Sequence, residues 1–94
     1  MPEPVHVEGK KSAGIMLYAL STCGWCKKTK ALLNELGVEY DYIDVDQLEH
    51  NEREKIMEEV SRWNPSRSFP TIVINEERSI IGFKPDELRK VVEE

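Results

Sequence analysis

Two cysteines separated by two residues, Cys23 and Cys26, constrain this chain more than any other feature, because they are its only cysteines. They follow the apolar run of residues 15–20 and precede residues 27–36, in which leucines recur at helical spacing. This order predicts a strand, a short loop and a helix. Residues i and i+3 at a helix start lie roughly 5–6 Å apart, within the Cα separation of a disulfide. The two sulfurs could therefore bond and separate with little movement.

The order of the following elements indicates an α/β fold. Residues 39–45 alternate well enough for a second strand, and the helix between the two strands makes them parallel. An amphipathic helix comes next. Its start is open between two capping boxes, formed either by Asp46 with Glu49 or by Asn51 with Glu54.

The last third of the chain adds a hairpin and a final helix. Residues 71–74 and 78–81 are short β-rich runs, and residues 75–77 between them favour a hairpin turn. Pro85 suits the first turn of the last helix. The resulting order, β-α-β-α-β-β-α, predicts a three-layer α/β/α protein in which three helices cover a four-stranded mixed sheet.

Length and local composition indicate a single domain. Ninety-four residues lie just above the size below which one core rarely suffices without disulfides or metals. We expect this domain to span residues 15–94. Residues 1–14 contain two prolines, two glycines and two adjacent lysines, a composition typical of a flexible arm.

The charge and hydropathy of the chain argue against two classes of partner. Thirteen Lys and Arg against 18 Asp and Glu give a net charge of -5, and no basic stripe could follow a nucleic acid. The apolar run of residues 15–20 is far shorter than the ~20 residues of a membrane span, and residues 1–14 lack the apolar block of a signal peptide. We therefore expect a cytoplasmic protein, where a lone cysteine pair is more typical of catalysis than of structure.

The predicted helix start assigns the two cysteines different roles. Free backbone N–H groups at a helix N-terminus stabilise a thiolate, and nearby cations do the same. Cys23 is therefore expected to be the catalytic nucleophile, with Lys27 a candidate for stabilising its charge. Cys26, one turn into the helix, should be buried and act as the resolving thiol. The pair would form a redox-active disulfide that requires no cofactor.

Other interpretations of the motif are less favoured. Two such cysteines can form half of a zinc site, but only His6 and His50 could add imidazole ligands. We expect both histidines to be surface residues and predict no metal site. An inert structural pair is the other alternative. Trp25, between the cysteines, is expected either as an exposed docking contact or packed over the first helix.

Together these residues resemble the glutaredoxin family, which has a thioredoxin-like fold. The resemblance covers residues 15–94 and implies a thiol-disulfide oxidoreductase that reduces protein disulfides. It also implies that Pro70 is cis, lies beside Cys23 and aligns the backbone of an incoming peptide or glutathione. The three motifs that carry it are Cys23-Gly24-Trp25-Cys26, Phe69-Pro70-Thr71 and Gly82-Phe83-Lys84-Pro85-Asp86. Contacts with substrate or partner are implied for Gly24, Trp25, Phe69, Thr71, Gly82, Phe83 and Lys84.

Two departures from the family pattern indicate a branch. Glutathione-using members usually carry a Lys where this chain has Leu20, and a Gly-Gly run where it has Gly82-Phe83. Residues 82–86 are instead similar to the Gly-Phe-Arg-Pro-Asp of NrdH-type redoxins, which pass electrons from thioredoxin reductase to ribonucleotide reductase. Residues 80–81 are Ile-Ile where that branch has Trp-Ser. We expect a monomeric dithiol redoxin with weak or no glutathione dependence. Its electron donor is open among thioredoxin reductase, a ferredoxin-linked reductase and glutathione.

Two alternatives to this redoxin are open. Some glutaredoxins hold a [2Fe-2S] cluster between two protomers, through the first cysteine of each and two glutathione thiols. A Gly after that cysteine favours the cluster, and Gly24 meets this condition. Without a glutathione pocket, however, two Cys23 thiolates supply only two of four ligands. The other alternative is a glutathione-dependent glutaredoxin that removes glutathione from protein thiols.

Overall fold

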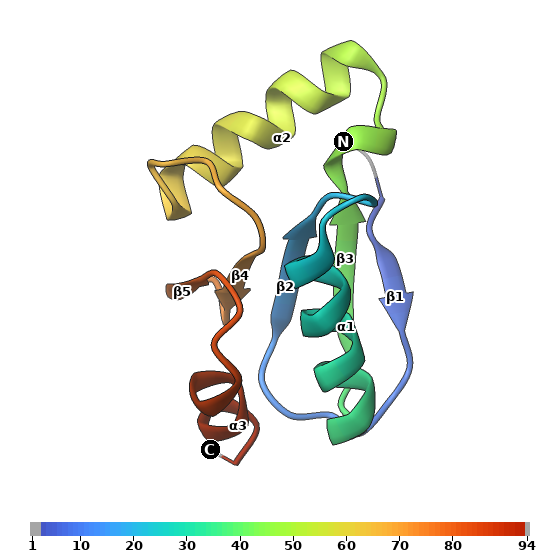
Figure 1. The fold of residues 1–94 in the computed structure, drawn as a ribbon, viewed down its shortest axis with the longest axis vertical. Helices are drawn as coiled ribbons and strands as arrows, with labels where there is room; N and C mark the ends of the chain where they lie inside the picture. Colours follow the sequence, from blue (N-terminus) through green and yellow to red (C-terminus); the bar gives the residue numbers. More distant parts are fainter. Residues whose placement is uncertain (1–2, 94) are drawn as a thin grey trace.

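Five strands form one mixed sheet, and three helices pack on it (Figure 1). The computed structural model describes residues 3–93; residues 1–2 and 94, the outer ends of the predicted arm and domain, lie outside the described residues. The strand order is β1-β3-β2-β4-β5, with only β2 and β3 parallel among the described neighbours. In chain order the elements are β1 (Val5–Val7), β2 (Ile15–Ala19), α1 (Gly24–Leu36), β3 (Tyr40–Asp44), a 3-10 turn η1 (Val45–Gln47), α2 (His50–Trp63), β4 (Thr71–Ile74), β5 (Arg78–Ile81) and α3 (Pro85–Glu93).

Alternation along the central strand β2 separates two hydrophobic cores. Leu17 belongs to the core that α1 and α3 cover, whereas its neighbour Tyr18 belongs to the core that α2 covers. Leu33 of α1 and Leu88 of α3 are completely buried in the first core. Burying a leucine side chain stabilises the fold by roughly 1.5–3 kcal/mol, so these contacts fix α1 on the sheet. The predicted three-layer α/β/α arrangement is thereby confirmed.

The sheet has five strands rather than the predicted four, because part of the predicted arm joins it. Strand β1 (Val5–Val7) pairs antiparallel with β3, and His6 lies opposite Asp41. The Lys10 N–H donates to the Gly37 carbonyl (2.7 Å), and the Glu39 N–H donates to the Lys10 carbonyl (3.0 Å). The prolines, glycines and lysines of this segment suggested a flexible arm. The strand itself gives no sequence signal, because it has only three residues and its pairing partner lies 35 residues further along the chain.

The two longer helices begin in different ways. Helix α1 starts directly after Cys23 and ends at Gly37, whose φ of 70° is a left-handed conformation that glycine adopts without strain. Helix α2 starts after Glu49, and no side chain caps it. Both proposed capping boxes are therefore wrong. The Asp46 carboxylate instead accepts hydrogen bonds from Ser21, which lies in the loop after the neighbouring parallel strand β2.

The β4–β5 hairpin is confirmed, with a turn in which Asn75 and Glu76 have φ angles of 54° and 56°. Two successive left-handed residues are typical of the tight turns that match the twist of a hairpin. The Asn75 side chain also accepts a hydrogen bond from the Gly14 N–H (2.7 Å), which ties the turn to the start of β2.

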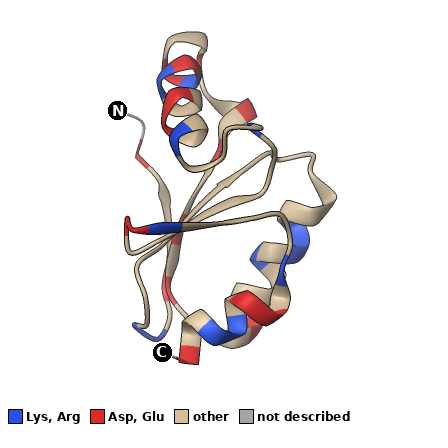
Figure 2. Ribbon diagram, turned by 90° about the vertical axis from the view of Figure 1, so that its left-hand side faces the viewer, with Lys and Arg blue, Asp and Glu red and all other residues tan. Residues whose placement is uncertain are grey.

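Lys and Arg as well as Asp and Glu lie on the helices (Figure 2). In helix α2, the acidic Glu52 lies in the first turn and the basic Arg62 in the last turn, as the helix dipole favours. Among residues 3–93, no helix is both long enough and apolar enough to cross a bilayer.

Candidate functional site

Cys23 is the N-cap residue of α1. The loop after β2 is closed by a hydrogen bond from the Cys23 N–H to the Leu20 carbonyl (3.1 Å). The Cys23 Sγ accepts a hydrogen bond from the Cys26 backbone N–H (3.1 Å), as the side chain of a capping serine or aspartate would. This donor and the helix dipole both favour negative charge on the sulfur. Because the Cys23 side chain is only partly buried, a substrate can reach that sulfur.

Cys26 lies in the first turn of α1 and is completely buried, with 0% of its surface exposed. Both cysteines are free thiols in this structure. Burial raises the pKa of the Cys26 thiol to about 12, and its hydrogen bond with Cys23 acts in the same direction. Cys26 is therefore a neutral thiol at physiological pH, whereas Cys23 occupies the position that stabilises a thiolate.

The burial of Cys26 predicts that the reduced protein loses stability at alkaline pH. An unfolded thiol titrates near ~8.5, so above that pH the unfolded chain releases a proton that the folded chain, with its pKa of about 12, retains. The free energy of unfolding should fall by up to about 1.4 kcal/mol per pH unit. Urea unfolding between about pH 7.5 and 9.5 measures this slope, which Cys26→Ser should flatten. Equal slopes in the two proteins would contradict the assignment.

The loop before β4 lies against the first cysteine. The peptide bond between Phe69 and Pro70 is cis, the conformation that the family resemblance implies. The Phe69 carbonyl oxygen lies 4.0 Å from the Cys23 Sγ. The Pro70 carbonyl accepts a hydrogen bond from the Gly82 N–H (2.9 Å), and Gly82 has a φ of 86° that a side chain would strain. This bond holds the loop after β5 beside the loop before β4.

A small apolar groove lies between these two loops and the start of α1. Trp25 is 57% exposed, and its ring stacks on that of Phe83 at a centroid distance of 5.8 Å. The Lys28 ammonium also lies over the Trp25 ring, 4.6 Å from its centroid. Trp25 is therefore at the surface rather than packed over α1. The groove has a volume of about 220 Å³ and is lined by Trp25, Phe69, Pro70, Gly82 and Phe83.

Four other residues of the predicted site lie outside this groove lining. Thr71 is completely buried, and its hydroxyl donates to the Ser68 carbonyl (2.8 Å), so it supports the loop rather than touching a substrate. Lys84 is exposed and lies 3.9 Å from a carboxylate oxygen of Glu87. The remaining two, Gly24 and Lys27, are exposed in the first turn of α1. Within residues 3–93, the Lys27 ammonium makes no hydrogen bond with either cysteine sulfur.

The loop before β4 also depends on Asn64, a residue that no sequence motif indicates. This C-cap residue of α2 is only 1% exposed. Its Nδ2 donates to the carbonyl and hydroxyl of Ser68 and to the Thr71 hydroxyl, each at 3.0 Å. Its Oδ1 accepts from the Ser66 N–H (3.1 Å) and hydroxyl (2.6 Å). The Asn-Pro dipeptide after α2 signals a turn, but no local pattern signals this burial.

Two charged residues, Asp46 and Lys30, make contacts near the cysteines that the sequence does not predict. Asp46 accepts a hydrogen bond from the Ser21 N–H (2.8 Å), and its bonds from Ser21 lower the pKa of Asp46. This contact anchors the loop that carries Cys23. Lys30 lies one turn after Cys26 on the same helix face, 2.9 Å from Asp44. Its charge lowers the pKa of Cys26 and so opposes part of the effect of burial.

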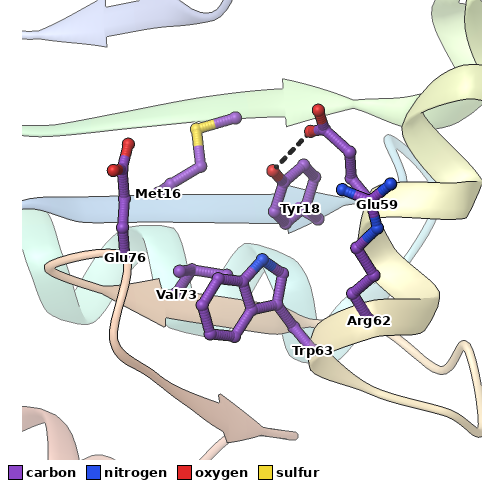
Figure 3. A pocket seen from close by; sticks show the side chains of 7 residues that line it. All are labelled: Met16, Tyr18, Glu59, Arg62, Trp63, Val73 and Glu76. Atoms are coloured by element: carbon purple, nitrogen blue, oxygen red, sulfur yellow. Dashed lines mark hydrogen bonds between the residues drawn. The ribbon is translucent and has the colours of Figure 1, made fainter.

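A larger cavity of about 420 Å³ opens on the α2 side of the sheet (Figure 3). Its walls include Met16, Val73 and Trp63, and the Tyr18 hydroxyl there donates to Glu59 (3.2 Å). Burial raises the pKa of Tyr18 to about 12, so this phenol stays neutral. Neither cysteine lines the cavity, because both belong to the opposite core. The smaller groove beside Cys23 is therefore the candidate redox site.

The fold and this site define the chain as a protein of thioredoxin-like fold with a dithiol at a helix N-terminus. The family model for glutaredoxin matches residues 15–79. The chain belongs to the glutaredoxin family, as the sequence motifs indicate. This is a family of thiol-disulfide redox proteins.

Solved structures and curated relatives agree with this family. The crystal structure of the glutaredoxin from Methanosarcina mazei Go1 is 52% identical, with a TM-score of 0.87, and covers 97% of this chain and 88% of its own. Methanosarcina acetivorans methanoredoxin is 49% identical with the same TM-score of 0.87, covering 89% of this chain and 88% of its own. Glutaredoxin 1 of Rickettsia felis is 40% identical over 61 residues, which are 65% of this chain and 57% of that relative. The chain thus matches little more than half of that relative's length.

Proposed function

We propose that this protein is a dithiol redoxin that reduces protein disulfides by thiol-disulfide exchange. The observation that carries the proposal is the asymmetry of the two sulfurs. Cys23 caps α1, accepts the Cys26 N–H at 3.1 Å and is partly exposed, whereas Cys26 is fully buried. One sulfur is thus suited to attack a substrate, and the other can react only with its neighbour.

The reaction has two steps. The Cys23 thiolate attacks one sulfur of a substrate disulfide, forming a mixed disulfide and releasing the other substrate sulfur as a thiolate. Cys26 then gives its proton to the released substrate thiolate, directly or through water, and the Cys26 thiolate attacks the Cys23 Sγ. This step breaks the mixed disulfide, releases the second substrate thiolate and leaves Cys23 and Cys26 joined. Two electrons have passed to the substrate, and a reductant must return two electrons to the protein.

The apolar groove defines the substrate class that we propose. Its lining residues carry no charged side chain, and the stacked pair Trp25 and Phe83 forms one wall. Such a surface favours an extended peptide with an apolar or aromatic residue next to its half-cystine. It provides no ionic contact for the charged ends of glutathione. Ribonucleotide reductase is one acceptor that the resemblance to NrdH-type redoxins implies.

Truncating Trp25 tests this substrate preference. For a peptide disulfide with a flanking Phe, Trp25→Ala should raise KM by about 5- to 30-fold, as expected when an exposed aromatic contact worth roughly 1–2 kcal/mol is removed. The kcat should change little, because neither sulfur is altered. Trp25→Phe keeps an aromatic ring and should stay close to wild type. An equal rise in KM for a matched peptide with flanking Gly would show that the groove does not recognise the residue next to the half-cystine.

The electron donor is tested by offering several reductants to the oxidised protein. We propose that a thioredoxin reductase or a ferredoxin-linked reductase restores the dithiol. We also propose that the protein is a monomer and is located in the cytoplasm. Free thiols persist in that compartment. Reduction by glutathione at a comparable rate would instead support a glutathione-dependent glutaredoxin. Restoration of the dithiol can be followed by thiol alkylation and intact mass.

We also propose that the reaction needs no resident cofactor. A shared [2Fe-2S] cluster needs four thiolate ligands, and burial removes Cys26 from the set that a partner protomer could share. Anaerobic purification tests this point. A colourless monomer is expected. A brown wild-type dimer, together with a colourless Cys23→Ser variant, would instead support the cluster.

A further inference from the structure

A four-residue cluster lies at the β1 edge of the sheet, on β1, β3 and the residues next to them. His6 faces Asp41 across the strand pair, and its Nδ1 lies 2.6 Å from an Asp41 carboxylate oxygen. The other ring nitrogen, Nε2, lies 3.3 Å from Glu39 and 3.7 Å from Glu8. Ligand atoms of His6, Glu8 and Glu39 all lie within 4.8 Å of one another.

We propose that His6, Glu8 and Glu39 form a zinc-binding site that is separate from the cysteines. Two ligands about 2.0–2.1 Å from a tetrahedral zinc ion lie roughly 3.3 Å apart. The distance between His6 Nε2 and the Glu39 carboxylate is 3.3 Å, and the distance to Glu8 is 3.7 Å, so small side-chain movements complete the geometry. One imidazole and two carboxylates leave a fourth position for water.

The contact with Asp41 supports this assignment because it acts on the other nitrogen of the ring. A zinc-binding histidine usually donates its second N–H to a carboxylate, which fixes the tautomer and turns the free lone pair toward the metal. Asp41 occupies that position, 2.6 Å from Nδ1. Three carboxylates surround one imidazole, so even a protonated His6 leaves excess negative charge, which a divalent cation would balance.

The position of the ligands indicates what the ion would do. His6 lies in β1 and Glu8 directly follows it, whereas Glu39 directly precedes β3. A zinc ion would therefore link the N-terminal strand to the body of the sheet. Metal binding to residues that folding brings together stabilises the folded state.

Zinc titration by calorimetry tests the proposal on the full chain with both cysteines replaced by serine, because thiols would bind the same metal. One zinc ion per chain is expected. His6→Ala should abolish this binding, and Asp41→Asn should weaken it by about tenfold or more. His50→Ala is the matched control. The His50 ring also lies 3.0 Å from a carboxylate, that of Glu54, but within residues 3–93 it belongs to no group of three possible metal ligands. It should bind zinc as the parent does.

Three results would overturn the proposal. The first is an absence of zinc binding, which would leave the cluster as an ion-pair network around a protonated His6. The second is equal binding of Mg²⁺, and the third is equal loss of zinc binding in His6→Ala and His50→Ala. Magnesium prefers oxygen ligands, so either outcome would show that the imidazole of His6 does not select the metal. None of these outcomes bears on the thiol chemistry, since the tested protein lacks both cysteines.

Discussion

Replacing Cys23 by serine is expected to reduce disulfide reductase activity by about a thousandfold or more, which is the scale of losing a covalent nucleophile. A serine hydroxyl is not ionised at neutral pH and cannot form the mixed disulfide. The fold should be retained, because serine is a good helix N-cap and can accept the Cys26 N–H that Cys23 accepts now. Activity is measured as kcat/KM for reduction of a protein disulfide, with thermal unfolding as the check on folding.

Cys26→Ser is the matched variant for this prediction. It retains the attacking sulfur, so it should complete the first step but stall as a mixed disulfide with the substrate. Multiple turnover should therefore be lost while a single thiol of the substrate is still released. The roles would be reversed if Cys26→Ser lost the first step and Cys23→Ser kept it. Full activity in both variants would rule out the redox function at this site.

Asn64→Ala is expected to destabilise the protein by about 3 kcal/mol. The substitution removes the bonds to Ser68 and leaves the hydroxyl oxygen of the buried Thr71 without its donor, and an unsatisfied buried polar group costs roughly 1–3 kcal/mol. For a domain of this size, the melting temperature should fall on the order of 10–20 °C. Because Asn64 braces the loop that ends at Pro70, kcat/KM should also fall at temperatures where the variant is folded.

Asn51→Ala provides the control for Asn64. Asn51 is exposed in the first turn of α2, so removing its amide should change stability by no more than about 0.5 kcal/mol. Denaturant unfolding of the two variants measures the difference. Similar small effects in both would show that the polar network around Asn64 contributes little to the loop.

The sequence allowed the chemical centre to be predicted because its signals are local. The cysteine pair, the leucines after it and Gly37 lie within one strand-helix unit, and the structure places α1 between Cys23 and Gly37. The hairpin at residues 75–77 is equally local. The family resemblance added the cis bond before Pro70, which local spacing does not signal.

The features that escaped prediction depend on partners far away in the sequence. Strand β1 has only three residues, and its place in the sheet depends on pairing with β3. Thr71 was expected at a binding surface, but its side chain points to Asn64 and is buried. Asp46 was a capping candidate for α2, yet its carboxylate binds the loop before Cys23. In each case a tertiary contact replaced the local interaction that the pattern favoured.

Trapping the reaction intermediate tests the division of roles between the two cysteines most directly. Each single Cys→Ser variant is mixed with a peptide disulfide, and the adduct is located by mass spectrometry after proteolysis without reductant. Cys26→Ser should carry one peptide, on Cys23, that dithiothreitol releases. Cys23→Ser should carry none, because Cys26 is completely buried and its thiol pKa is about 12. A stable peptide adduct on Cys26, or none on Cys23, would contradict the account.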